Sequence, residues 1–548
     1  MKTLIRWLWG VILVASCTSQ PKNDFKDNGY QSDTVYISGQ VLNFPEGKTL
    51  QVAYMKFVED EQVRLDVTPD SAGHFEIQVP VINSTRLFLY YFMKANSITL
   101  FAEPGEKIEI QSDWEEETLT FSGEHARTHQ DVYDYWRYVD SLALPYSYIE
   151  TMDRGISHEE FYQKMKSEWC KNDSLLNSYR QLHPQMSERA VRQVQMLNLN
   201  RFAVLLMQRR FVLDFKKREP FPNSYMSHAD SIFSIFPRPY TLGDLTFLRD
   251  YLDYYYEQQH AKVAGNMKML FDYLKEHKGM DLTEEQQMDW EFLNTPEMRV
   301  ALNEASQAMS SNPKYEAALI DRWCGGIGLV SMPDDLKELM YAYYHYFYLD
   351  GSRKAMHEDN VARFRSWVKN PTLAEPVLQY QERLVKLANM SLDEQLSLMD
   401  YDHLKGCETG EELFREIVKP YEGKLVYLDV WGTWCSPCKR EMEHASFIKQ
   451  AMKGKEVVFL YLANRSPEES WKNVIKEYGL TGEQVVHYNL PDVHQDRLEK
   501  YLGVRSFPTY ILIDRKGNIV DRNPPRPSSE KRLVDYLNEC LQKKPSGI

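Results

Sequence analysis

The sequence predicts a multidomain protein, with an N-terminal antiparallel β domain, an all-α middle region and a C-terminal α/β domain. A chain of 548 residues is too long for one hydrophobic core. Its hydropathy pattern changes from short alternating blocks, to apolar residues three and four apart, to buried strands that alternate with helices. With 43% hydrophobic and 26% charged residues, the composition is that of globular domains rather than of a disordered chain.

The first 17 residues predict export from the cytosol. Lys2 and Arg6 precede an apolar run from Trp7 to Ala15, which is shorter than the about 20 residues that a spanning helix needs. The run ends in "VASC", which resembles the lipobox of bacterial lipoproteins and implies lipidation at Cys17. An ordinary secretory signal with an incidental cysteine is the alternative. Polar residues 18–32 then suit a solvated tether.

Residues 33–123 form short alternating blocks separated by turn sequences such as "SAG" and "EPGE", which predicts a β-sandwich-like domain. This segment contains no cysteine and no glycine-rich phosphate loop, so we expect a scaffold or a recognition module. The net charge of −14 leaves no basic footprint, and we expect no nucleic-acid partner.

Residues 124–404 are predicted to be helical, with proline-containing breaks between helices. Tyrosines are dense here, as at Tyr254 to Tyr256 and at Tyr343 and Tyr344. They are expected to fill the core and domain interfaces, although a partner-binding groove is an open alternative. His125 and His129 lie four apart, but no third ligand follows at a metal-site spacing, so we expect no metal site.

Residues 405–548 predict an α/β sheet with helices on both faces. The apolar segment "KLVYLDVW" reads as a buried strand, the motif "WGTWCSPCKRE" follows it, and "KREMEHASFIKQAM" reads as one helix. The two cysteines of the motif therefore lie where a strand ends and a helix begins.

That position predicts redox chemistry for Cys435 and Cys438. The unpaired N–H groups and the dipole at a helix start stabilise an anion, so Cys435 is expected to be the nucleophile. Cys438 lies one turn further on, within disulfide reach, and Pro437 is tolerated in a first turn. A zinc site lacks further ligands, and a disulfide at an exposed helix start should be labile rather than a permanent staple.

Two acids and one proline accompany the cysteines. Asp429 lies on the preceding strand and is expected beneath the disulfide, and Glu441 returns to about the helix face of Cys438. Both acids are predicted to move protons, although Glu441 as a solvated surface residue is the alternative. Pro508 precedes the strand "TYILID", where proline requires a cis bond or the first strand position.

The motif and "VRSFPTYILIDRKGNIV" together resemble the thioredoxin superfamily, and within it the TlpA/ResA-type periplasmic thiol-disulfide oxidoreductases. The β domain resembles the one found ahead of thioredoxin modules in exported lipoproteins of Gram-negative bacteria. The resemblance implies that Cys435 attacks, that Cys438 resolves and that Pro508 is a cis-proline. We assign substrate binding to Trp434, Phe507, Pro508 and Thr509, and expect no cofactor beyond the redox-active cysteine pair.

The predicted function is reduction of disulfides in exported proteins, by a chain that is lipid-anchored in the cell envelope of a Gram-negative bacterium and faces the periplasm. A membrane thiol-transfer protein would supply the electrons. The acids oppose a thiolate and favour a reductase, whereas Lys439 and Arg440 are expected to be exposed and screened. The alternative is a membrane-anchored partner-binding protein or sensor in which the C-terminal domain is a docking module. The sequence leaves the pairing of Cys170, Cys324, Cys407 and Cys540 open.

Overall fold

The computed structural model describes residues 29–94, 97–142, 155–212, 220–236, 245–259, 265–391 and 398–542. The predicted signal, Cys17 and most of the tether lie outside these residues. In the described ranges, no helix combines the length and the apolar character needed to cross a membrane. The chain divides into two compact units. The first comprises Met1–Ala261, Asp321–Tyr344 and Phe364–Pro376, and the second Lys262–Ile320, His345–Arg363 and Val377–Ile548.

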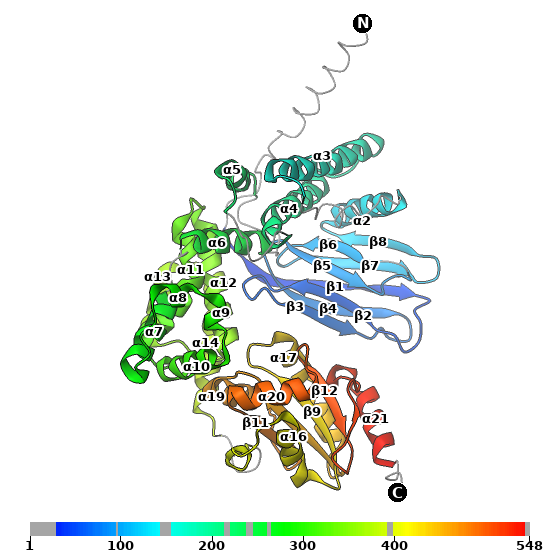
Figure 1. Cartoon of the computed structure of the whole chain (residues 1–548). Helices are drawn as coiled ribbons and strands as arrows, with labels where there is room; N and C mark the ends of the chain where they lie inside the picture. The colour runs from blue at the N-terminus through cyan, green and yellow to red at the C-terminus, as the bar shows by residue number, and fades with distance from the viewer. Residues whose placement is uncertain are drawn as a thin grey trace. The chain divides into compact units, whose positions relative to one another are not determined.

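The first unit begins with two four-stranded sheets, in the orders β4-β1-β7-β8 and β3-β2-β5-β6 (Figure 1). Their strands are β1 (Ser32–Leu42), β2 (Leu50–Met55), β3 (Gln62–Val67), β4 (His74–Ile82), β5 (Thr85–Tyr90), β6 (Ile98–Ala102), β7 (Lys107–Asp113) and β8 (Thr118–Gly123). Alternate residues of β4 are buried, as the sequence pattern predicts, and one core joins the inner faces of both sheets. The pairing is antiparallel, as predicted, except between β1 and β7, which are parallel. The "SAG" turn depends on Gly73, whose φ is +84° and whose Cβ would lie 2.2 Å from the Val41 carbonyl oxygen.

The helical residues divide between the two units. The helices up to residue 259 are α2 (Ala126–Ser141), α3 (His158–Leu182), α4 (Glu188–Val212), α5 (Asn223–Ile232) and α6 (Thr246–Gln259). Those that follow are α7 (Gly265–Lys278), α8 (Glu284–Met288), α9 (Trp290–Leu293), α10 (Pro296–Met309), α11 (Pro313–Cys324), η3 (Gly325–Leu329), α12 (Asp334–Ser352), α13 (Glu358–Trp367) and α14 (Pro371–Asn389).

In the first unit, the two histidines make separate contacts. Nε2 of His129 lies 2.7 Å from a Glu106 oxygen, with both side chains buried, and this pair joins α2 to the β domain. His125 faces Arg189 instead. Tyr254, Tyr343 and Tyr344 are buried, as the core interpretation of the tyrosines predicts, whereas Tyr255 and Tyr256 are half-buried.

The C-terminal part of the second unit is a five-stranded sheet in the order β11-β10-β9-β12-β13. Its strands are β9 (Leu425–Trp431), β10 (Val457–Ala463), β11 (Val485–Asn489), β12 (Thr509–Ile513) and β13 (Ile519–Asp521). Its helices are η4 (Asp402–Leu404), α16 (Gly410–Val418), η5 (Lys419–Tyr421), α17 (Ser436–Met442), α18 (Ala445–Ala451), α19 (Glu468–Glu477), α20 (Asp492–Leu502), η6 (Pro527–Ser529) and α21 (Lys531–Gln542). β9, β10 and β11 are parallel, and β12 and β13 are antiparallel to their neighbours.

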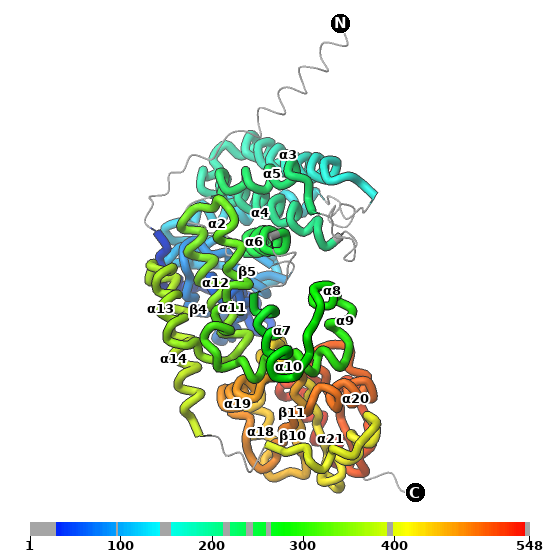
Figure 2. Tube along the Cα trace, turned by 60° about the vertical axis from the view of Figure 1, so that its left-hand side comes forward, coloured from blue at the N-terminus to red at the C-terminus, as the bar shows by residue number. Residues whose placement is uncertain are grey.

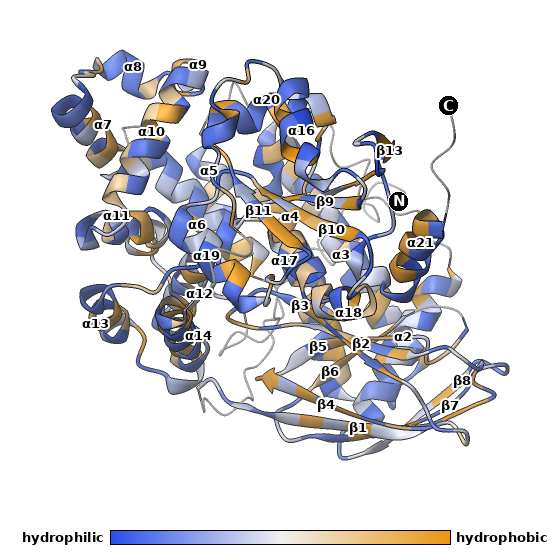
Figure 3. Ribbon diagram, turned by 90° about the horizontal axis from the view of Figure 1, so that it is seen from below, coloured by the Kyte–Doolittle hydropathy of each residue, from blue (hydrophilic) through white to orange (hydrophobic). Residues whose placement is uncertain are grey.

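Two separate cores cover the faces of this sheet. The core on one face takes residues from α17, α18, α19 and α21, and the core on the other takes residues from α16 and α20. Every residue of β9 and of β10 is buried, which explains their continuous apolar runs, and β9 and β11 stand out as hydrophobic in Figure 3. In the same unit, α10 packs beside α20, where Arg299 forms an ion pair with Asp496 (Figure 2).

The segment after the cysteine motif is two helices rather than the one predicted helix. α17 ends at Met442 and α18 begins at Ala445. Contacts with residues 528–530 hold the break, because Glu441 accepts hydrogen bonds from Ser528, and Nδ1 of His444 lies 2.9 Å from Glu530. The residues that contact the break lie some 90 positions further along the chain, so the local sequence pattern does not predict it.

Candidate active site

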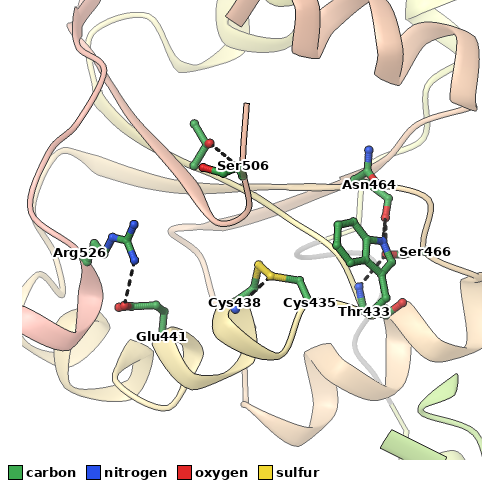
Figure 4. Close-up of a disulfide and its surroundings, with 10 residues drawn as sticks. Thr433, Cys435, Cys438, Glu441, Asn464, Ser466, Ser506 and Arg526 are labelled. Atoms are coloured by element: carbon green, nitrogen blue, oxygen red, sulfur yellow. Dashed lines mark hydrogen bonds and ion pairs between the residues drawn. A yellow bond between two sulfur atoms is a disulfide. The ribbon is translucent and has the colours of Figure 1, made fainter. Parts of the chain in front are cut away.

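The cysteine pair lies at the junction of β9 and α17, as predicted. Cys435 is the N-cap of α17, and its Sγ accepts a hydrogen bond of 3.2 Å from the backbone N–H of Cys438. The two cysteines form a disulfide with a Cα–Cα distance of 5.3 Å (Figure 4). Cys438 is fully buried and Cys435 is 3% exposed, so only the first of the two cysteines has any exposed surface.

The loop before Cys435 is held by the loop after β10. The N–H of Thr433 donates to Oγ of Ser466 at 3.0 Å, and Nε1 of Trp434 donates to the Asn464 carbonyl oxygen at 3.2 Å (Figure 4). Gly432 is required here, since a Cβ at this position would lie 2.6 Å from Nε1 of Trp434. These contacts fix where the cysteine enters the helix.

The residues predicted to bind substrate gather beside the motif. The Trp434 side chain is 48% exposed, and its ring meets that of Phe507 edge-on at 5.0 Å. The Phe507–Pro508 peptide bond is cis, and Thr509 opens β12, which pairs with β9. An exposed apolar edge therefore lies next to an extended backbone segment, which is a surface that can take a peptide chain.

Asp429 lies buried at the centre of the sheet. It is 4% exposed, and its direct cross-strand neighbours are Tyr461 on β10 and Tyr510 on β12. Its Oδ1 has no hydrogen-bond partner among the residues that the structure describes. Burial raises the pKa of Asp429 well above its usual range, and the charge of Glu441 raises it further. This carboxyl therefore keeps its proton to a higher pH than an exposed aspartate does, which suits it to exchange a proton with a nearby base.

Glu441 is buried rather than solvated, which excludes the surface alternative. It is 9% exposed, and its carboxylate accepts hydrogen bonds from the N–H of Ser528 at 2.8 Å and from Oγ of Ser528 at 3.1 Å. Arg526 lies 4.0 Å away (Figure 4). A cavity of about 10 Å³, enough for about one water molecule, is lined by both Glu441 and Asp429. The two acids therefore share one enclosed space.

Lys439 is buried, so the expectation that it is exposed and screened was wrong. It is 3% exposed, and its Nζ lies 3.0 Å from a carboxylate oxygen of Asp350 and 3.2 Å from the Asp350 carbonyl oxygen. Burial and then the charge of Arg353 lower the pKa of Lys439, Asp350 opposes the change, and the resulting pKa is about 8. Arg440, the next residue, is exposed as expected.

Sequence reasoning missed the partners of the site. Ser528 and Asp350 lie 87 and 89 residues from the residues that they contact, and no local pattern marks them. Tyr461 and Tyr510 read in the sequence only as parts of apolar strands, because the register that places them beside Asp429 is set by strand pairing across the sheet. Cys407 and Cys540, whose pairing the sequence left open, remain thiols.

Comparison with known proteins shows which family this domain resembles. Residues 423–519 match the family model described as thioredoxin-like. The thiol-disulfide oxidoreductase ResA of Bacillus thuringiensis subsp. konkukian is 30% identical over 122 residues, which are 22% of this chain and 66% of the relative. ResA of Geobacillus kaustophilus is 33% identical over 99 residues, or 18% of this chain and 53% of the relative. A solved thiol:disulfide interchange protein from a Bacteroides species is 27% identical, covers 24% of this chain and 81% of its own, and has a TM-score of 0.20. The chain thus spans less than two thirds of these curated relatives.

Replacing Asp429 by asparagine is expected to stabilise the domain. Because the folded pKa lies above the unfolded one, the buried carboxyl contributes stability only below the unfolded pKa, and that contribution is lost as the pH rises. Asp429→Asn should therefore increase protection of the β9 amides at pH 7.5 by about 1–3 kcal/mol, and by less at pH 5. Hydrogen–deuterium exchange of the oxidised chain, corrected for intrinsic rates, measures this. The exposed Asp535→Asn is the matched control, and unchanged or weaker protection in Asp429→Asn would contradict the expectation.

Proposed function

We propose that this protein, whose C-terminal domain is thioredoxin-like, is a thiol-disulfide oxidoreductase that reduces disulfides of exported proteins. The observation that supports this function best is the Cys435–Cys438 disulfide at a helix start, in the same domain as two buried acids that line one cavity. No part of the cycle requires a prosthetic group, since the cysteine pair carries both electrons.

The first step is attack on the substrate. When the pair is reduced, the Cys435 thiolate accepts a hydrogen bond from the Cys438 N–H and lies at the positive end of the α17 dipole. It attacks one sulfur of the substrate disulfide, the substrate S–S bond breaks, and a mixed disulfide forms while the other substrate sulfur leaves as a thiolate. The substrate backbone lies along Phe507–Thr509, against the exposed ring of Trp434.

The second step is resolution by Cys438. This thiol is fully buried and must lose its proton before it can attack Sγ of Cys435. Glu441 is the proton acceptor that we propose, because its position three residues further on places it near Cys438. Asp429 lines the same cavity as Glu441, which lets the two acids exchange the proton. The substrate leaves as a dithiol after taking up two protons, and the pair is left oxidised.

The direction of electron flow follows from the charges. The motif contains Ser436 and Pro437 between its cysteines and no histidine, and the two acids oppose a thiolate. A destabilised thiolate makes the dithiol a better electron donor, which favours a reductase.

A dithiol donor must then reduce the pair again. Because the N-terminal segment predicts export and lipidation at Cys17, we propose that this donor is a membrane thiol-transfer protein, and that the chain faces the periplasm from a lipid anchor. The substrates are then disulfides of other exported proteins.

Replacing Cys435 should abolish turnover. In insulin reduction by dithiothreitol, Cys435→Ser should lose the rate enhancement over dithiothreitol alone, because a hydroxyl cannot replace the thiolate nucleophile. The control is Cys407→Ser, which removes a thiol of the same domain and should leave the rate unchanged. A wild-type protein no faster than Cys435→Ser would favour the docking-module alternative.

Replacing Cys438 should trap the substrate. Cys438→Ala removes the resolving sulfur, so mixed disulfides between Cys435 and exported proteins should accumulate when the full chain is expressed in a bacterial envelope. Non-reducing electrophoresis followed by mass spectrometry identifies them. The double variant Cys435→Ser/Cys438→Ala should trap none, and equal capture by both variants would refute attack by Cys435.

Glu441 should act on resolution rather than on attack. In Glu441→Gln, release of a preformed mixed disulfide should slow by about tenfold or more at pH 6–7, while alkylation of Cys435 should change less. Quenched-flow analysis of a mixed disulfide with a small aromatic thiol measures the release. The exposed neighbour Glu443→Gln is the control, and release at the wild-type rate in Glu441→Gln would contradict this role.

A further inference from the structure

The buried Lys439 belongs to a charged network that the thioredoxin-like sheet does not supply alone. Its carboxylate partner, Asp350, lies in the last turn of α12, and all residues of the network belong to the second unit. Oδ1 of Asp350 pairs with Arg353 at 3.0 Å, and Arg353 also contacts the Glu477 carboxylate of α19 at 3.0 and 3.2 Å. The guanidinium further donates to the Tyr380 hydroxyl. Asp350 is thus held from the side opposite Lys439.

The end of α12 is capped by side chains of the redox domain. The last carbonyl groups of a helix lack partners within the helix. Here Lys439 donates to the Asp350 carbonyl, Ser470 to the Ser352 carbonyl, and Asn473 to the Arg353 carbonyl at 2.9 Å. The negative end of the α12 dipole therefore meets the Lys439 ammonium, which is the favourable orientation.

The backbone at Arg353 shows how closely this end is fixed. Arg353 has a φ of +51°, a left-handed conformation that is uncommon for a residue other than glycine. The contacts on both its carbonyl and its side chain hold it there, and its side chain is only 6% exposed. Contacts on both the backbone and the side chain therefore hold the residue that follows α12.

Stability does not explain the buried lysine. Removing an ammonium and a carboxylate from water costs about as much as their pairing returns, and apolar residues of similar size are often equally stable in such places. A lysine kept buried in the first turn of the redox helix therefore calls for a role in the chemistry. Its N–H donates to the Cys435 carbonyl at 3.2 Å, so it lies one turn from the nucleophile and next to Cys438.

We propose that Asp350 is a positioning residue of the redox site, which holds the Lys439 ammonium beside the cysteine pair and thereby promotes ionisation of Cys435. The helical region then sets the reactivity of the thiol through the end of α12. This inference rests on the proposed function, because it concerns the same thiolate. The charged groups that face Lys439 are Asp350, Arg353 and Glu477, and of these only the two carboxylates favour its protonated form.

The test is alkylation of Cys435 in the reduced full chain that carries Cys438→Ala. Iodoacetamide labelling is followed by peptide mass spectrometry from pH 5 to 9. Lys439→Met should slow labelling at pH 6 by about threefold, because a cation near the thiolate is lost. Asp350→Asn should also slow it, since Lys439 would then face Arg353 without its carboxylate and lose its proton more readily. Adding Asp350→Asn to Lys439→Met should change nothing further.

The control is Arg440→Met, which removes an exposed cation from the neighbouring position and should have a smaller effect than Lys439→Met, because solvent screens it. Wild-type labelling in Lys439→Met would overturn the proposal. So would an effect of Asp350→Asn that persists in the Lys439→Met background, or one that speeds labelling. Hydrogen exchange of β9 shows whether each variant remains folded.

A second readout separates this inference from the proposed function. With Cys438 present, Lys439→Met should hold a larger oxidised fraction of the pair in a fixed glutathione buffer, since a less stable thiolate makes the couple more reducing. Neither measurement requires turnover of a protein substrate. A chain that fails in insulin reduction but shows both shifts would sink the proposed function alone, whereas normal insulin reduction without either shift would sink only the role of Asp350.

Discussion

The hydrogen bond from the Cys438 N–H to Sγ of Cys435 is the contact on which the rest of the site depends. It exists because β9 ends at Trp431 and α17 begins at Ser436, so the N-cap position falls on a cysteine. A helix start offers N–H groups without partners and a partial positive charge, and a sulfur placed there is a better anion than a sulfur in water. The cysteine follows the carboxyl end of β9, the central strand of the sheet. The loop after β10 holds the segment before the cysteine through Thr433 and Trp434.

Two opposing sets of charges surround this sulfur. Asp429 and Glu441 line one cavity with room for about one water molecule, and a negative charge on either acid disfavours a further negative charge on the sulfur. In our proposal, Lys439 in the first turn of the same helix favours a negative charge on the sulfur. Because all three side chains are buried, solvent screens none of them fully, and small displacements change the balance. The reactivity of the thiol therefore depends on the balance between the acids, which oppose the thiolate, and the ammonium, which favours it. The positions of these groups matter as much as their identities.

The sequence predicted what short segments determine. The continuous apolar run of β9 indicated a strand buried on both faces, and an acid within such a run had to be buried with it, so the environment of Asp429 followed. Cys435 at the helix start followed from the same local reading. The burial of Lys439, the break between α17 and α18 and the parallel pairing of β1 with β7 depend on partners far along the chain. A lysine in the first turn of a helix reads as exposed unless its distant carboxylate is known, and this explains why the sequence prediction failed there.

The same contacts bear on where the functional domain begins. A boundary at residue 405 follows the change in sequence pattern, and the thioredoxin-like match begins at 423. Yet Glu477, with a side chain 2% exposed, finds its cationic partners in Arg353 and Arg383, and Lys439 finds its carboxylate in Asp350. A buried charge without its partner costs several kcal/mol, about the size of a domain's whole stability margin. The sheet domain therefore shares buried ion pairs with Asp350, Arg353 and Arg383, and these helical residues belong to the same compact unit as the thioredoxin-like domain although no part of the cysteine motif lies in them.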